Sequence, residues 1–125
     1  VSDGVMLSLA FMAIAHQPIP PRILLVEEPE NGVHHASLKY TAETLKHLSA
    51  EKGVQIILTT HSPYLVDHVD PEEVFVFSKD DEGAVHAKRF SDHPDVETLR
   101  KHFMTGEMWT GFDEEEFVKG KGKFE

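Results

Sequence analysis

The sequence predicts an α/β domain with a mostly parallel sheet, and three observations carry that prediction. Two short apolar runs, residues 22–27 and 54–60, have the β-branched and leucine-rich composition of strands buried on both faces. Residues 35–53 between them repeat apolar side chains at helical spacing. A strand, a helix and a strand in this order form a βαβ unit, whose strands are parallel and whose crossover is right-handed.

The helix inside this unit and the helix before it differ in pattern. In the segment 35–53 the apolar side chains fall on one stripe, and Gly53 suits a C-terminal cap. That stripe consists of Leu38, Ala42, Leu45 and Leu48. Residues 2–15 are apolar nearly all round, so we expect this first helix to be buried on most sides until three prolines end it.

The C-terminal part of the sequence predicts shorter elements. Residues 62–69 form a short helix, and segments 73–78 and 84–90 flank the turn sequence KDDEG as an antiparallel hairpin. An amphipathic helix follows over 94–103 with Val96, Leu99 and Phe103 inward, and a last short helix lies within 112–120. We expect one domain over residues 1–118 and a disordered tail over 119–125.

Composition and charge narrow the class of protein. The 125 residues include no cysteine, which removes disulfides and thiolate metal sites and fits a reducing, cytoplasmic compartment. The net charge of −10 disfavours binding of nucleic acid by this chain itself, because the phosphate backbone would be repelled. No apolar run approaches the ~20 residues of a membrane span, so no membrane contact is expected.

Polar side chains follow both predicted strands. Glu27 and Glu28 end the first strand, and Thr59, Thr60 and His61 end the second. Ligands bind at the carboxyl ends of parallel strands, so we expect these side chains to converge on one edge. A metal ion with an anionic ligand would satisfy both acids, because one can bind the metal while the other takes a proton from water.

The first residues add an anion site. In Val1-Ser2-Asp3-Gly4, a Ser-x-Gly sequence precedes the first helix, whose N-terminus presents free backbone N–H groups. Gly4 lets a phosphate approach the backbone closely. Ser2 or Asp3 can also serve as the N-cap of this helix, and a cap and an anion site use the same N–H groups.

Together these motifs resemble the second half of an ABC-type ATPase domain. VSDG resembles the signature motif, ILLVEEP the Walker B motif, ENGVHH the D-loop and TTHSP the loop of the switch histidine. The order of these four motifs is similar to that in SMC-like and RecF-like proteins and in the AAA ATPase-like predicted ATPases of bacterial defence systems. The likeness covers roughly the first two-thirds of the chain, and four motifs in order are a far stronger signal than one.

The resemblance implies a P-loop NTPase-like, three-layer fold that uses Mg²⁺ and ATP. It makes Glu27 the magnesium-side acid, Glu28 the general base for the attacking water and His61 the contact to the γ-phosphate. Ser2 and Gly4 take the phosphate-contacting positions of the signature motif. Asn31 and His34 are the functional members of the D-loop, which crosses a dimer interface.

Three features depart from the family pattern. Glu27 stands where the family usually has aspartate, and Asp3 where it has a small residue. No Walker A sequence, G-x-x-x-x-G-K-[ST], is present, and this loop supplies the backbone cradle and the lysine for the phosphates. We therefore expect a chain that is inactive alone and that completes its site with a Walker A lobe from an upstream region or another chain, as a homodimer or with such a partner. Contact with nucleic acid would need regions outside this sequence.

Plainer interpretations stay open. The chain can be a catalytically inactive module for dimerisation or partner binding, derived from the same fold. Taken singly, the acid pair fits a solvated strand end and His61 fits a capping histidine. A metallohydrolase is disfavoured, because the acids and histidines match no H-E-x-x-H spacing.

Overall fold

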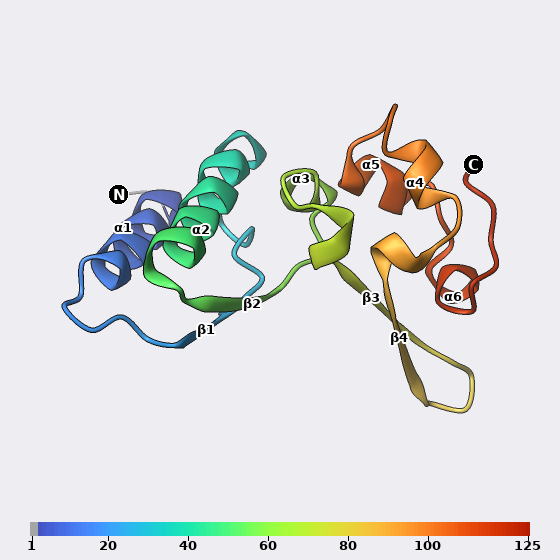
Figure 1. Ribbon diagram of the computed structural model, residues 1–125, viewed down its shortest axis with the longest axis horizontal. Helices are drawn as coiled ribbons and strands as arrows, with labels where there is room; N and C mark the ends of the chain where they lie inside the picture. Colours follow the sequence, from blue (N-terminus) through green and yellow to red (C-terminus); the bar gives the residue numbers. More distant parts are fainter. Residues whose placement is uncertain (1–2) are drawn as a thin grey trace. The chain divides into compact units, whose positions relative to one another are not determined.

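The computed structural model describes residues 3–125, so Ser2, a predicted phosphate contact, lies outside the described residues. The chain divides into two compact units, residues 1–65 (unit 1) and 66–125 (unit 2). Unit 1 contains the parallel strands and unit 2 the antiparallel hairpin, each with its own helices (Figure 1). This α/β architecture confirms the predicted fold class. Among the described helices, none has the length and apolar character to cross a bilayer.

Unit 1 is built on two parallel strands. Its elements are α1 (Asp3–Ala15), β1 (Ile23–Glu27), the short 3-10 helix η1 (His35–Ser37), α2 (Leu38–Lys52) and β2 (Gln55–Thr59). The strands pair in parallel from Ile23 opposite Gln55 to Glu27 opposite Thr59. α3 (Pro63–Val66) then carries the chain out of the unit. The βαβ unit expected from the sequence is confirmed.

The stripe predicted on α2 forms the core of unit 1. All four of its apolar side chains are buried, and two of them, Leu38 and Ala42, pack with Leu65. Leu58 of β2 lies against the same cluster. The helix ends at Gly53, whose φ of +65° is left-handed and whose N–H donates to Ser49 O at 3.0 Å. The predicted glycine cap is thereby confirmed.

The opposite face of the sheet is bare. Figure 1 shows α1 and α2 on the same side of the β1–β2 pair. On the other side, Ile23, Leu25 and Ile57 form what we call the bare sheet face, with Leu25 73% exposed. The prediction of strands buried on both faces is therefore wrong. Apolar composition indicates that a strand face favours contact with another element, but it does not show whether this chain supplies that element.

Helix α1 is also less buried than predicted. Phe11 is its one fully buried side chain among residues 3–15, and four large apolar side chains are about half exposed. These four are Val5, Met6, Leu9 and Met12. The expectation of a helix buried on most sides is wrong for the same physical reason as in the sheet.

Unit 2 combines a hairpin with short helices. Its strands β3 (Phe75–Lys79) and β4 (Val85–Arg89) pair antiparallel, which confirms the predicted hairpin. The other elements are η2 (Pro71–Glu73), η3 (Phe90–Asp92), α4 (Val96–Leu99), α5 (Thr105–Thr110) and α6 (Glu114–Val118). α4 is much shorter than the helix predicted over 94–103, and Phe103 is partly exposed rather than inward.

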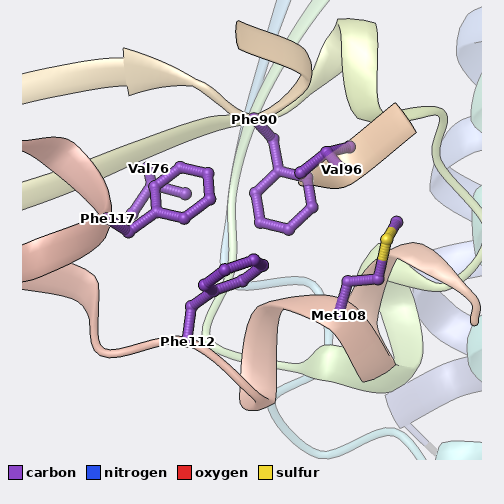
Figure 2. Close-up of a cluster of buried hydrophobic side chains, with 6 residues drawn as sticks. All are labelled: Val76, Phe90, Val96, Met108, Phe112 and Phe117. Atoms are coloured by element: carbon purple, nitrogen blue, oxygen red, sulfur yellow. The ribbon is translucent and has the colours of Figure 1, made fainter. Parts of the chain in front are cut away.

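An aromatic core closes unit 2. Figure 2 shows the buried side chains Val76, Phe90, Val96, Met108, Phe112 and Phe117 gathered around the ring of Phe90. The rings of Phe90 and Phe117 stack at 4.9 Å, and buried His93 stacks on Phe117 at 4.7 Å. After α6 the chain forms no helix or strand, yet Phe124 packs against this core and Glu125 N donates to Gly111 O at 3.0 Å.

Candidate functional site

The carboxyl ends of β1 and β2 meet at one edge of unit 1. Glu27 pairs with Thr59 as the last residues of the ladder, and the N–H of Glu28 then donates to Thr59 O at 2.9 Å. This bond keeps the segments that follow β1 and β2 side by side as they leave the sheet. The turn after β1 and the loop after β2 therefore start from the same place, as the parallel topology predicts.

Glu28 and His61 contact each other at this edge. His61 Nε2 lies 3.3 Å from Glu28 Oε1, and Asn31 Nδ2 donates to Glu28 Oε2 at 2.8 Å. Each carboxylate oxygen thus has its own nitrogen partner. The side chains of His61 and Glu28 are 84% and 35% exposed, so a ligand can reach both. Three of the residues predicted for the site are brought together here.

The backbone of Glu28 is unusual. Its φ of +41° lies in the left-handed region, which a residue with a Cβ rarely adopts. The turn that follows is closed by Asn31 N donating to Glu28 O and by Val33 N donating to Glu30 O, both at 3.0 Å. A non-glycine residue held at such a φ costs about 1–3 kcal/mol, and such positions cluster at functional sites.

Glu27 lies on the uncovered face of the sheet. It is the last residue of β1, is exposed, and shares the strand face of Leu25 rather than the face covered by the helices. Across residues 3–125, no three His, Asp or Glu side chains are grouped as a self-sufficient metal site would need. Carboxylate oxygens do suit magnesium, which usually takes one or two carboxylates and completes its shell with water and substrate phosphates. Glu27 fits that limited role.

The start of α1 lies against the turn after β1. A Cβ on Gly32 would come within 2.6 Å of Asp3 Oδ2, and a Cβ on Gly4 would lie 3.5 Å from Val33. The carboxylate of Asp3 is thus directed at Gly32. This places Gly4 next to the D-loop-like turn.

His34 has a local role in the structure. Its Nδ1 accepts the N–H of Ala36 at 3.2 Å, which caps η1. Its ring lies 4.3 Å from that of His35, whose ring lies 5.3 Å from Tyr64. These contacts set His34 apart from the Glu28–His61 pair, although both belong to the same end of unit 1.

The sequence did not single out Glu30, yet it contacts the site. Glu30 Oε1 accepts the backbone N–H of His61 at 2.8 Å, while Glu30 Oε2 is buried without a hydrogen-bond partner among the described residues. In the sequence it is a charged residue of a turn, a type that is usually solvated. The pair Glu27 and Glu28 at the strand end indicated a site more strongly, and no local sequence pattern distinguished Glu30.

A solved structure defines the class of fold. It is described as "Structural biochemistry of ATP-driven dimerization and DNA stimulated activation of SMC ATPases", and it is similar to this chain with a TM-score of 0.60 at 19% identity. The similarity covers 79% of this chain and 57% of that chain, so the present sequence spans little more than half of that SMC ATPase chain. At this identity the likeness concerns the fold alone, which is a P-loop NTPase fold.

The family follows from the sequence itself. The sequence model of the family described as "AAA domain, putative AbiEii toxin, Type IV TA system" matches residues 1–67, more than half of the chain. The chain belongs to this AAA-domain family. A search of the curated proteins finds no significant match.

Proposed function

We propose that this chain supplies the signature and Walker B half of a dimeric ABC-type ATPase. One observation carries the proposal: an acid and a histidine at the carboxyl ends of two parallel strands lie 3.3 Å apart, between Glu28 Oε1 and His61 Nε2. Such a pair can act on one phosphate group, because the acid is a base for water and the imidazole donates to a phosphate oxygen. Membership of an AAA-domain family supports nucleotide as the ligand.

Each side chain has a distinct task in this proposal. Glu28 accepts the proton of the water that attacks the γ-phosphate, and His61 stabilises the charge that spreads over the phosphate oxygens. The amide of Asn31, which donates to Glu28 Oε2 at 2.8 Å, fixes the carboxylate so that its other oxygen faces His61. His34, whose ring caps η1, would contribute to the proposed dimer interface.

Magnesium and the second nucleotide contact complete the proposed site. Glu27 would hold Mg²⁺, directly or through water, and the bound ion neutralises charge on the β- and γ-phosphates. Ser2 and Gly4 would bind the nucleotide of the opposite protomer at the start of α1. The direction of the Asp3 side chain toward Gly32 supports this, because it keeps a negative charge turned to the chain's own turn.

The bare sheet face supports the need for another lobe. Ile23, Leu25 and Ile57 form an exposed apolar surface, and burying it against a lobe that carries Walker A would remove it from water. The same surface favours the second candidate function, a catalytically inactive module for dimerisation or partner binding. The two candidates differ in whether Glu28 is needed for turnover. The cytoplasmic location and contact with nucleic acid through other regions stay predictions.

Phosphate release separates the two candidates. The chain is mixed with Mg-ATP, alone and together with a chain that carries a Walker A lobe, and turnover is expected in the mixture alone. Glu28→Gln should lower that turnover by about 10²- to 10⁴-fold, because the general base is lost while the side chain keeps its shape. The matched control is Glu51→Gln on the exposed side of α2, which should leave turnover unchanged.

The opposite result is equally clear. Formation of a complex without nucleotide turnover, or turnover that is indifferent to Glu28→Gln, would reject the ATPase proposal and favour the interaction module.

A further inference from the structure

Glu30 joins the two segments that carry the candidate site. Its Oε1 accepts the backbone N–H of His61, a residue 31 positions away in the sequence, at 2.8 Å. The same two segments are also joined by the bond from Glu28 N to Thr59 O at 2.9 Å. One bond sets the register of the strand ends, and the bond to Glu30 sets where the chain at His61 lies.

These two bonds flank the contact between Glu28 and His61. The imidazole of His61 is highly exposed, so little packing restrains it. Its direction therefore depends on its backbone, whose N–H is held by Glu30. A hydrogen bond from a backbone N–H to a carboxylate is charge-assisted and stronger than one to a neutral acceptor.

The second oxygen of Glu30 argues against a purely stabilising role. Glu30 Oε2 is buried and has no hydrogen-bond partner among the described residues. A buried oxygen without a partner costs free energy, more so when it belongs to a charged group.

We propose that Glu30 is a positioning residue whose carboxylate holds the backbone of His61 so that the imidazole faces Glu28. The bond itself needs no nucleotide. Its importance for hydrolysis rests on the function proposed above.

The first experiment requires no ATP. Amide hydrogen exchange of His61 is measured by NMR in the full chain and in the variants Glu30→Ala and Glu30→Gln. Loss of the acceptor should speed exchange of the His61 amide by about tenfold in Glu30→Ala, while Glu30→Gln, which keeps an oxygen acceptor, should stay close to the parent chain. Glu51→Ala on α2 is the control and should leave the His61 amide unchanged.

A second measurement separates positioning from simple packing. Glu28→Gln should shift the ring resonances of His61 in the parent chain and in the Glu30→Gln background, because the imidazole of His61 and the side chain of Glu28 are still in contact there. In the Glu30→Ala background the same substitution should shift them little. An equal shift in all three backgrounds, or unchanged His61 exchange in Glu30→Ala, would overturn the proposal.

The consequence for turnover is tested in the mixture with the Walker A lobe. Glu30→Ala should lower kcat by about tenfold with little change in KM, and Glu30→Gln should restore most of it. Normal kcat in a Glu30→Ala chain whose His61 amide has lost protection would make Glu30 a structural residue only. Absence of turnover in the parent chain would reject the ATPase proposal and leave the two NMR measurements to decide the role of Glu30.

Discussion

Unit 1 and unit 2 close their apolar surfaces to different degrees. Unit 1 has the longer helices and a regular parallel pair, yet one face of its sheet and much of α1 are exposed. Unit 2 is made of short elements, and Phe90, Phe112 and Phe117 are nevertheless buried together in one core. The exposed apolar side chains of unit 2, such as Phe75 and Phe77, lie on its hairpin. The acids and histidine of the candidate site belong to unit 1, whose sheet face and first helix are exposed. Regular secondary structure is therefore a poor guide to how complete a core is.

The largest expected effect breaks the core of unit 2. Phe90→Ala should lower the free energy of unfolding by about 3–5 kcal/mol, because a fully buried ring is lost and a cavity remains. Urea unfolding followed by fluorescence measures this directly, since the chain has a single tryptophan, Trp109, which packs against that core.

The bare sheet face supplies the matched control. Leu25→Ala also removes a large apolar side chain, but Leu25 is mostly exposed, unlike Phe90. The free energy of unfolding should therefore change by no more than about 0.5 kcal/mol. A loss as large as that of Phe90→Ala would mean that the face is covered within this chain, and the contrast between the units would fail.

A smaller effect is expected at the turn of unit 1. Gly32 has a φ of +78°, and a Cβ there would come within 2.6 Å of Asp3 Oδ2. Gly32→Ala should therefore destabilise unit 1 by about 1–3 kcal/mol, through both backbone strain and steric conflict. Thermal unfolding followed by far-UV circular dichroism is the measurement.

Two companion variants sharpen this result. Gly4→Ala should have little effect on unfolding, because its Cβ would meet Val33 at an ordinary 3.5 Å. Adding Asp3→Ala to Gly32→Ala should recover the steric part of the loss and leave the part due to φ. Full additivity of the two substitutions would show that Asp3 does not lie against the turn.

The smallest expected effect concerns the loss of stability of unit 2 at low pH. Arg100 donates to both oxygens of Glu72, and this hydrogen bonding lowers the pKa of Glu72 below its ordinary value. An acid with a lowered folded-state pKa contributes stability above its unfolded pKa, and the contribution is lost as the pH falls through the folded pKa. Glu72→Gln should therefore make acid unfolding, followed by Trp109 fluorescence, less steep.

Some acid dependence should remain in this variant. The pKa of Asp80 is also lowered, chiefly by its hydrogen bond with His86, and it contributes with the same sign. Glu51→Gln in unit 1 is the control. If Glu72→Gln leaves the acid unfolding curve unchanged, the ion pair between Glu72 and Arg100 does not contribute to stability.

The sequence predicted what depends on local period and on topology. The stripe of α2 and its glycine cap follow from spacing alone, and the approach of Glu28 to His61 follows from two parallel strands that end together. The roles of these residues in turnover stay predictions. The composition could not tell that Leu25 lacks cover, because that depends on a neighbour and not on the strand.

Helix α5 and Glu30 were missed for a related reason. The first turn of α5 is held by bonds to distant residues, with Glu107 N donating to Asp67 Oδ1 at 3.1 Å and Thr105 Oγ1 donating to Val69 O at 2.7 Å. Glu30 likewise matters through a bond to a residue 31 positions away. Contacts of this kind leave no periodic mark in the sequence.

The left-handed backbone at residue 28 has an evolutionary consequence. Glycine or asparagine would adopt the φ of +41° at less cost than glutamate, so the chain would gain stability by giving up the acid. Drift without selection should therefore replace the acid at this position. The residue found here in related chains thus records whether natural selection still acts on the carboxylate, independently of any assay.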